Sequence, residues 1–182
     1  MKTDHITIRM SEELISNIIT AVGLPHNAGW RTIFRSIFQK PTRNLASIGL
    51  SFDQLIQEAG LSKAAEWVLQ HWCSGIKTIK QGEIPADGPL LVMSNHPGAY
   101  DALAIASQVT RPDLNIIVSD LFFLRNLPNF CKRVFFIPLD KNQVAQRMAG
   151  LLASIRYLKR GGSVLLMGSG TIDPDPGPPL PR

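Results

Sequence analysis

A histidine and an aspartate stand five positions apart in the stretch SNHPGAYDAL, which spans residues 94–103 and contains a Pro-Gly turn. If the Asp101 carboxylate reaches one imidazole nitrogen of His96, it fixes the tautomer and leaves the other nitrogen free to take a proton from an alcohol. This is the base and orienting group of a hydrolytic triad, without a protein nucleophile. The same residues also suit a structural role, in which Asp101 caps a helix over ALAIASQV and His96 bonds the backbone. The spacing alone is a weak motif and leaves both interpretations open.

The position of His96 in the chain favours the chemical interpretation. His96 follows PLLVMSN, a short continuous apolar run typical of a buried strand, and precedes Pro97 and Gly98, which bend the chain back toward the end of that strand. We therefore expect Asp101 to begin the next helix and to hold the imidazole at the same time.

The elements that position this pair are predicted from residue 75 onward, where short apolar runs and turns alternate. Strands are expected at 75–83, 89–95, 114–120, 133–139 and 163–168, and helical segments at 101–109, 121–127 and 142–161. Such alternation predicts a three-layer α/β domain with a mainly parallel sheet. Ligands of such sheets bind beyond the carboxyl ends of the strands, where the loops SNHPGAYD, PLDK and GSGTID fall.

Residues 1–74 are predicted to form a helical segment that precedes or packs on the α/β core at 75–182. Its first helix, SEELISNIITAV, is expected to begin with Ser11 as N-cap, and its second, WRTIFRSIFQKP, to end at Pro41. A third helix is predicted over KAAEWVLQHWCSG.

The second of these helices has an apolar face opposite a basic one. The apolar residues are Trp30, Ile33, Phe34, Ile37 and Phe38, and the basic ones are Arg31, Arg35 and Lys40. We expect the apolar face to belong to the core, because that is the commonest use of such a stripe. The alternative is a helix lying in a membrane interface, with its rings in the acyl boundary and its arginines at lipid phosphates.

Three blocks of sequence resemble one known family. NHPGAYD, residues 95–101, looks like the His-x4-Asp signature of the glycerolipid and lysophospholipid acyltransferases, which include the 1-acylglycerol-3-phosphate acyltransferases. FIPLDK, residues 136–141, is similar to the Ile-Pro-Val-Asp-Arg block of that family, and GSGT, residues 168–171, resembles its Pro-Glu-Gly-Thr-Arg block. The blocks keep the family order and follow successive predicted strands, and the resemblance covers residues 75–176.

The resemblance implies acyl transfer, in which an acceptor hydroxyl attacks a fatty acyl thioester of coenzyme A or acyl carrier protein. It makes His96 the general base and Asp101 its orienting group, with no bound cofactor and no metal. Substrate binding would involve Lys141 and the residues Ser169, Gly170 and Thr171. The tetrahedral oxyanion needs hydrogen-bond donors, which we expect backbone amides near Gly168 to Thr171 to supply.

The departures from the family pattern concern the acceptor. Lys141 stands where the family usually has an arginine for an acceptor phosphate, and a lysine keeps the charge but loses the planar two-pronged contact. Ser169 replaces a glutamate and Ile172 an arginine. A glycerol-phosphate or lysophosphatidate acceptor and a lipid alcohol with another head group therefore both remain open. On its own, GSGTIDPDP is better explained as a turn of Asp, Pro and Gly than as a binding block.

The composition limits the partners and the compartment. With 182 residues, 45% of them hydrophobic, the chain suits one domain with a substantial core, and its net charge of +5 favours anionic surfaces. The most apolar windows are shorter than the roughly 20 residues that span a bilayer, and no signal peptide is expected. Cys73 and Cys131 lack metal-like spacing and are expected to be buried free thiols in a reducing compartment. The expected location is the cytoplasm, at the membrane surface.

Other functions find weaker support. A serine hydrolase using Ser169 lacks the first glycine of its nucleophile elbow, where Met167 stands, and a dinucleotide site has Asp173 in place of its third glycine. Nucleic-acid binding is not expected, since the basic residues are scattered. A non-catalytic membrane-surface module that uses the basic aromatic helix remains an alternative.

The last twelve residues, TIDPDPGPPLPR, contain no further strand or helix pattern. Because an α/β domain rarely stops at its ligand loop, we expect the chain to be a fragment of a longer polypeptide. A proline-rich natural terminus is the alternative.

Overall fold

A parallel sheet of four strands forms the centre of the computed structural model, which describes residues 2–79, 81–98, 100–168 and 173. The strands are β1 (Leu90–Ser94), β2 (Leu114–Ser119), β3 (Val134–Ile137) and β4 (Ser163–Met167), in the order β1-β4-β2-β3. All the pairings are parallel. The predicted α/β class with a mainly parallel sheet is confirmed.

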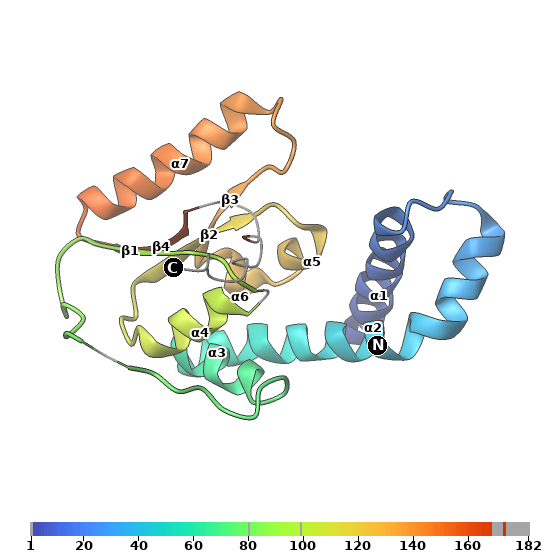
Figure 1. Ribbon diagram of the computed structural model, residues 1–182, viewed down its shortest axis with the longest axis horizontal. Coiled ribbons are helices and arrows are strands. Elements are labelled where there is room, and N and C mark those ends of the chain that lie inside the picture. The colour runs from blue at the N-terminus through green and yellow to red at the C-terminus, as the bar shows by residue number, and fades with distance from the viewer. Residues whose placement is uncertain (1, 80, 99, 169–172, 174–182) are drawn as a thin grey trace, which may run out of the picture.

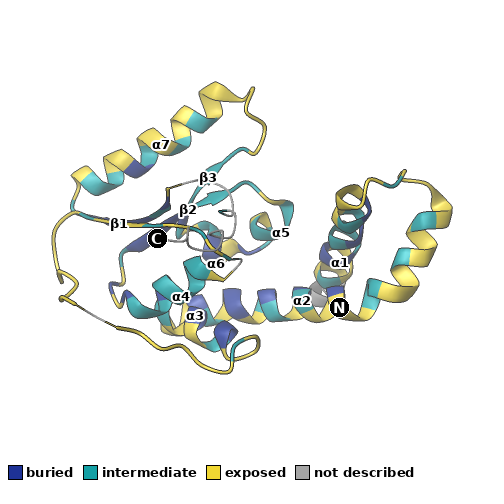
Figure 2. Ribbon diagram, viewed as in Figure 1, coloured by how far each residue is buried: buried dark blue, intermediate teal, exposed yellow. Residues whose placement is uncertain are grey.

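Helices cover both faces of this sheet, which gives the three predicted layers. In Figure 1, α7 (Val144–Lys159) lies on one face, and α3 (Leu61–Leu69), α4 (Asp101–Gln108) and α6 (Pro128–Cys131) lie on the other. A further short helix, α5 (Phe122–Arg125), follows β2. Most of the fully buried apolar side chains lie between the sheet and the second group of helices (Figure 2). The helical segments predicted at 101–109, 121–127 and 142–161 correspond to α4, α5 and α7, whereas α6 is not predicted.

The first two predicted strands differ from the structure. The prediction of a strand at 75–83 is wrong. The described residues of this range form no helix or strand, and Ile79 is 78% exposed. Ile76 and Ile79 are three positions apart, so a strand would place them on opposite faces, and no single core would bury both. The next strand, β1, is not buried as predicted but lies at the edge of the sheet, where Leu91 and Met93 are 47% and 63% exposed.

Residues 2–59 form a hairpin of two long helices, α1 (Lys2–Ala21) and α2 (Ala28–Ala59). Asn27 caps α2, since its side chain accepts a hydrogen bond from the Trp30 N–H at 3.0 Å. The predicted N-cap role of Ser11 is wrong. Ser11 is buried within α1, and its hydroxyl lies 2.7 Å from that of Thr42 on α2. The two long helices are thus joined by a buried polar contact.

Pro41 does not end the second helix, contrary to the prediction. α2 is 32 residues long, runs on past Pro41 to Ala59, and bends in Figure 1 between its light-blue first part and its cyan second part. A proline inside a helix removes one backbone hydrogen bond and displaces the preceding turn, which is the usual cause of such a bend. The Thr42 hydroxyl, directly after the proline, donates to the carbonyl of Phe38 at 2.7 Å.

The bend separates two different environments along α2. Before it, Ile33 and Ile37 are 47% and 59% exposed, so the prediction that this apolar face belongs to the core is wrong. After it, α2 packs against α3 and α6 beneath the sheet. There the buried Asp53 carboxylate accepts hydrogen bonds from the backbone N–H groups of Asn129 and Phe130, both at 2.8 Å. This contact fixes α2 to the start of α6.

At the amino ends of the strands, one carboxylate joins several elements. Arg111, which is buried, donates two hydrogen bonds to Asp113 at 2.9 and 2.6 Å, and Ser163 at the start of β4 donates to the same carboxylate at 3.1 Å. The hydrogen bond with Arg111 is the main reason why the pKa of Asp113 falls to about 2. The Tyr157 hydroxyl of α7 donates to the Asp113 carbonyl at 2.7 Å. This cluster holds β2, β4 and α7 together at the end of the sheet opposite the predicted ligand loops.

Candidate active site

The structure brings His96 and Asp101 into direct contact. His96 lies two residues beyond the end of β1, and Asp101 is the first residue of α4. The Nδ1 atom of His96 is 3.1 Å from Oδ2 of Asp101, and the two side chains are 22% and 23% exposed. The same Oδ2 accepts a hydrogen bond from the Gly98 N–H at 2.6 Å, which closes the Pro-Gly turn. The carboxylate therefore stabilises the turn and contacts the histidine at the same time.

This contact determines which nitrogen of His96 can act on a ligand. A carboxylate accepts a hydrogen bond, so Nδ1 carries the proton and Nε2 keeps a lone pair. Because the contact with Asp101 fixes the ring and His96 lines a cavity, the pair has the geometry of a base with its orienting group.

A third residue, Asp173, holds the backbone of His96. The His96 N–H donates to the Asp173 carboxylate at 2.6 Å, and the Asp173 N–H donates to the His96 carbonyl at 2.8 Å. The Gly168 N–H after β4 likewise donates to the Ser94 carbonyl at the end of β1, at 3.0 Å. Sequence reasoning missed this role of Asp173, because the adjacency of β1 and β4 is not encoded in any local pattern.

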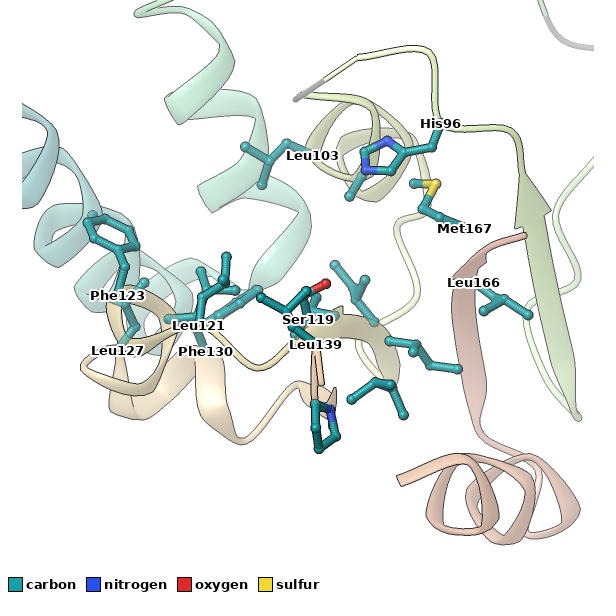
Figure 3. Close-up of a pocket in the computed structure, with 18 of the residues that line it drawn as sticks. His96, Leu103, Ser119, Leu121, Phe123, Leu127, Phe130, Leu139, Leu166 and Met167 are labelled. Carbon is teal, nitrogen blue, oxygen red and sulfur yellow. The ribbon is translucent and has the colours of Figure 1, made fainter. Parts of the chain in front are cut away.

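An apolar cavity of about 780 Å³ extends from His96 into the domain. It lies beyond the carboxyl ends of the strands and is lined mainly by aliphatic and aromatic side chains of α2, α4, β2, α5, α6 and the loop after β3. In Figure 3, His96 and Met167 lie at one side of the cavity, and Phe123, Leu127 and Phe130 at the opposite side. A volume of this size is typical of pockets that bury most of a small ligand.

Two cations line the same cavity, and they come from the segment after β3. Lys141, predicted as a substrate-binding residue, is exposed. Arg147 on α7 is partly buried and donates to the carbonyl of Pro138 at 2.6 Å, so it also supports the loop that carries Lys141. Sequence reasoning assigned no role to Arg147. A signal was present in its position six residues after Lys141, the last residue of the FIPLDK block.

The short helix α5 in the cavity wall is held by an ion pair. Arg125 donates to both carboxylate oxygens of Asp120, at 2.7 and 2.9 Å, and its guanidinium carbon lies 3.9 Å from the centroid of the Phe136 ring. The hydrogen bond from Arg125 lowers the pKa of Asp120, so that carboxylate is ionised at neutral pH. α5 is therefore fixed to the ends of β2 and β3.

The remaining predicted site residues, Ser169, Gly170 and Thr171, lie outside the described residues. Gly168 is described, but its N–H is already bonded to Ser94 and is not a free donor for an oxyanion. Among the residues that the structure describes, no group of three or more His, Cys, Asp or Glu side chains is arranged to hold a metal. Cys73 and Cys131 are free thiols but only partly buried. Within the described ranges, no helix is both long and apolar enough to cross a bilayer.

Comparison with known proteins adds a family to this geometry. No curated protein and no solved structure matches the chain. The family model described as Acyltransferase matches residues 75–178, which is more than half of the 182 residues and includes His96, Asp101 and Lys141. The chain belongs to the acyltransferase family, that of the glycerolipid and 1-acylglycerol-3-phosphate acyltransferases.

Proposed function

We propose that the protein moves a fatty acyl group from an acyl-CoA or acyl carrier protein thioester to a hydroxyl of a lipid acceptor. The observation that carries this proposal is the contact between His96 and Asp101 at one end of a large apolar cavity. The contact supports a general base, and the cavity suits a hydrocarbon chain. Acyl transfer to an alcohol uses both.

The reaction begins with an acceptor hydroxyl that donates to Nε2 of His96. As its oxygen attacks the thioester carbonyl carbon, the proton passes to Nε2, and the Asp101 carboxylate stabilises the imidazolium. The tetrahedral intermediate then collapses, the C–S bond breaks, and the leaving thiolate takes the proton from Nε2. The products are an ester and a free thiol, so the histidine returns to its starting state without a bound cofactor or metal.

The acyl chain of the donor occupies the apolar cavity in this proposal. Burial of hydrocarbon contributes roughly 0.8 kcal/mol for each methylene, so a cavity lined by aliphatic and aromatic residues favours a long chain over a short one. With the chain in place, the thioester lies near the His96 end of the cavity. The pantetheine arm of the donor then extends toward solvent.

The acceptor is a lysophospholipid, a glycerol phosphate or a related lipid alcohol, and Lys141 binds its anionic head group. Support comes from the position of Lys141 on the same cavity as His96. Ser169, Gly170 and Thr171 complete the acceptor side of the site in this proposal. Their place in the sequence directly after β4, the neighbour of β1, supports that assignment.

The reaction takes place at a membrane surface, on its cytoplasmic side. Before its bend, α2 has the exposed apolar residues Ile33 and Ile37. The same part of the helix also carries the exposed basic residues Arg31 and Lys40, so it is both apolar and basic at its surface. Such a helix binds the boundary between acyl chains and anionic head groups. A lipid acceptor then reaches the site without leaving the bilayer.

The experiment that tests this function uses the full chain with a panel of thioester donors and lipid acceptors, and product lipids are read by mass spectrometry. Substitution His96→Ala is expected to lower the rate about 10²- to 10⁴-fold, because a positioned base typically contributes that much. His71→Ala is the matched control, since His71 is exposed and lies outside the cavity.

The non-catalytic alternative makes the opposite prediction. A membrane-surface module would bind liposomes and form no product with any donor or acceptor in the wild-type chain. An acylation rate that His96→Ala leaves unchanged would contradict the catalytic role of His96.

A further inference from the structure

An open groove of about 430 Å³ adjoins the cavity that His96 lines. One wall of the groove belongs to α2, and the other is formed by the segments that follow α3 and precede α4. The lining side chains, apolar or aromatic except for one amide, are Pro41, Asn44, Leu45, Ile48, Trp72 and Tyr100. Three of them also line the His96 cavity, namely Leu45, Ile48 and Trp72. The groove and the cavity are therefore neighbours.

Two exposed aromatic rings form one wall of the groove. The ring centroids of Trp72 and Tyr100 are 5.0 Å apart and the ring planes differ by 25°, and the two residues are 37% and 42% exposed. Tyr100 directly precedes Asp101, so this wall begins beside the catalytic pair. Rings that are nearly parallel make a stacked surface and not the aromatic cage that encloses a quaternary ammonium group. The wall therefore suits a hydrocarbon chain better than a cationic head group.

The groove follows α2 toward the bend of that helix. Its lining residues on α2 extend from Ile48 back to Pro41, a rise of about 10 Å along a helix. Lys40 and Arg43 are exposed beside the Pro41 end of the groove, where their charges complement anionic lipid head groups. The groove thus leads from the cavity with His96 to the part of α2 that the proposed function assigns to the membrane surface.

We propose that this groove holds the hydrocarbon chain of the acceptor lipid. The inference rests on the proposed function, in which a lipid hydroxyl reaches Nε2 of His96. The hydroxyl end of the acceptor then lies in the cavity, and its chain passes over Trp72, which lines both hollows, into the groove. The acyl chain of the donor stays in the main cavity. An acceptor that carries a chain, such as a lysophospholipid, is therefore preferred to free glycerol phosphate.

Asn44 is the residue at which this inference is tested most directly. It lines the groove but is not among the residues that line the main cavity, and it is exposed, so a substitution there spares the core. Asn44→Trp places a large ring in the groove and is expected to exclude the chain. Asn44→Leu keeps the branched shape of the side chain and replaces the amide by hydrocarbon, so it is expected to strengthen the binding of the chain.

The test measures KM of the full-length protein for two lysophospholipids with the same head group, at one fixed concentration of acyl-CoA. Their acyl chains have roughly 16 and about 6 carbons, and burial of one methylene corresponds to about a fourfold change in a binding constant. Both acceptors are used below their critical micelle concentrations, so that binding to membranes does not enter the measurement. The wild type is expected to have the lower KM for the longer chain.

The variants are expected to change KM in opposite directions. Asn44→Trp should raise KM at least tenfold for the long-chain acceptor and less than about twofold for the short-chain acceptor, because the short chain buries little hydrocarbon in the groove. Asn44→Leu should lower KM for the long-chain acceptor about two- to fourfold. KM for acyl-CoA should stay the same in both variants, since the donor chain occupies the other hollow.

A matched control and a conservative pair separate this inference from general damage. Ser47 is also exposed on α2 but lines neither hollow, so Ser47→Trp should leave KM for both acceptors as in the wild type. Tyr100→Ala removes one ring of the stack and should raise KM for the long-chain acceptor, whereas Tyr100→Phe keeps the ring and should restore it. Circular dichroism checks that each variant is folded.

Three results would overturn the inference. They are equal KM values of the wild type for the two acceptors, a loss in Asn44→Trp that is the same for both acceptors or is shared by Ser47→Trp, and a wild type that acylates glycerol phosphate but neither lysophospholipid. Failure of the proposed function looks different, because the wild-type protein would then transfer no acyl group to any acceptor.

Discussion

The backbone of His96 is bound at both its N–H and its C=O by one residue, Asp173, which lies 77 positions later in the sequence. His96 follows the edge strand β1, and Asp173 belongs to the segment after β4, the neighbour to which β1 pairs. The side chain of His96 is held by a second residue, Asp101, which contacts its Nδ1 atom. The imidazole is thus positioned from two directions, through its ring and through its backbone.

The first prediction concerns Asp173 as a positioning residue. Substitution Asp173→Ala removes the acceptor for the His96 N–H, so we expect kcat to fall about tenfold or more with little change in KM, because a small displacement of a base is costly. Asp173→Asn keeps an oxygen acceptor and should restore most of the rate. A loss of stability with no change in kcat for the folded fraction would contradict this role.

The case of Asp173 also shows where sequence reasoning ends for this protein. The runs around β2, β3 and β4 are predicted because buried parallel strands are continuously apolar, and the helices of the α/β core because their apolar residues recur at helical spacing. Local patterns also place His96 at the end of a strand. They do not give the order of the strands, so the contact of Asp173 with His96 could not be predicted.

The N-terminal helices show a second limit. Pro41 is a strong helix breaker on average, yet α2 runs on past it, and the buried contact between Ser11 and Thr42 holds the bent helix to α1. Tertiary contacts therefore override the local signal.

The second prediction concerns the link between α2 and α6. Asp53 accepts two backbone N–H groups that begin α6, so Asp53→Ala leaves two partly buried donors without their acceptor. We expect a loss of about 2 to 3 kcal/mol in the free energy of unfolding, measured with urea. Asp53→Asn keeps one acceptor oxygen and should lose less. Equal stability of Asp53→Ala and wild type would show that this contact is not needed.

The third prediction addresses the charge at the cavity. Lys141→Gln removes a cation near the proposed acceptor site, so KM for an acceptor with a phosphate head group should rise about tenfold while KM for the acyl donor stays the same. Lys141→Arg keeps the charge and should retain most of the affinity. A parallel rise for an uncharged lipid alcohol would indicate that Lys141 does not bind a phosphate.

The fourth prediction follows from the pKa of Asp113, which lies at about 2 in the folded protein, against 3.8 for an ordinary aspartate. A lowered pKa stabilises the fold above pH 3.8, and this contribution is lost as the pH falls toward 2. Because the carboxylate is about one-third exposed and solvent screens it, the expected contribution is about 1 to 2 kcal/mol. Denaturant unfolding of Asp113→Asn should show a correspondingly smaller loss of stability between these two pH values, and an identical acid profile would contradict the assignment.

The fifth prediction concerns the apolar face before the bend of α2. Ile33 and Ile37 are 47% and 59% exposed, and their burial in a bilayer interface would contribute about 1 kcal/mol or more for each side chain. The double substitution of both residues by serine is therefore expected to weaken binding to anionic liposomes at least tenfold in a sedimentation assay. The fold should be unaffected, since neither side chain is buried. Ile76→Ser with Ile79→Ser is the matched control, because these isoleucines are also exposed but lie outside any helix. Equal binding of the α2 variant and this control would place the membrane contact on another surface of the protein.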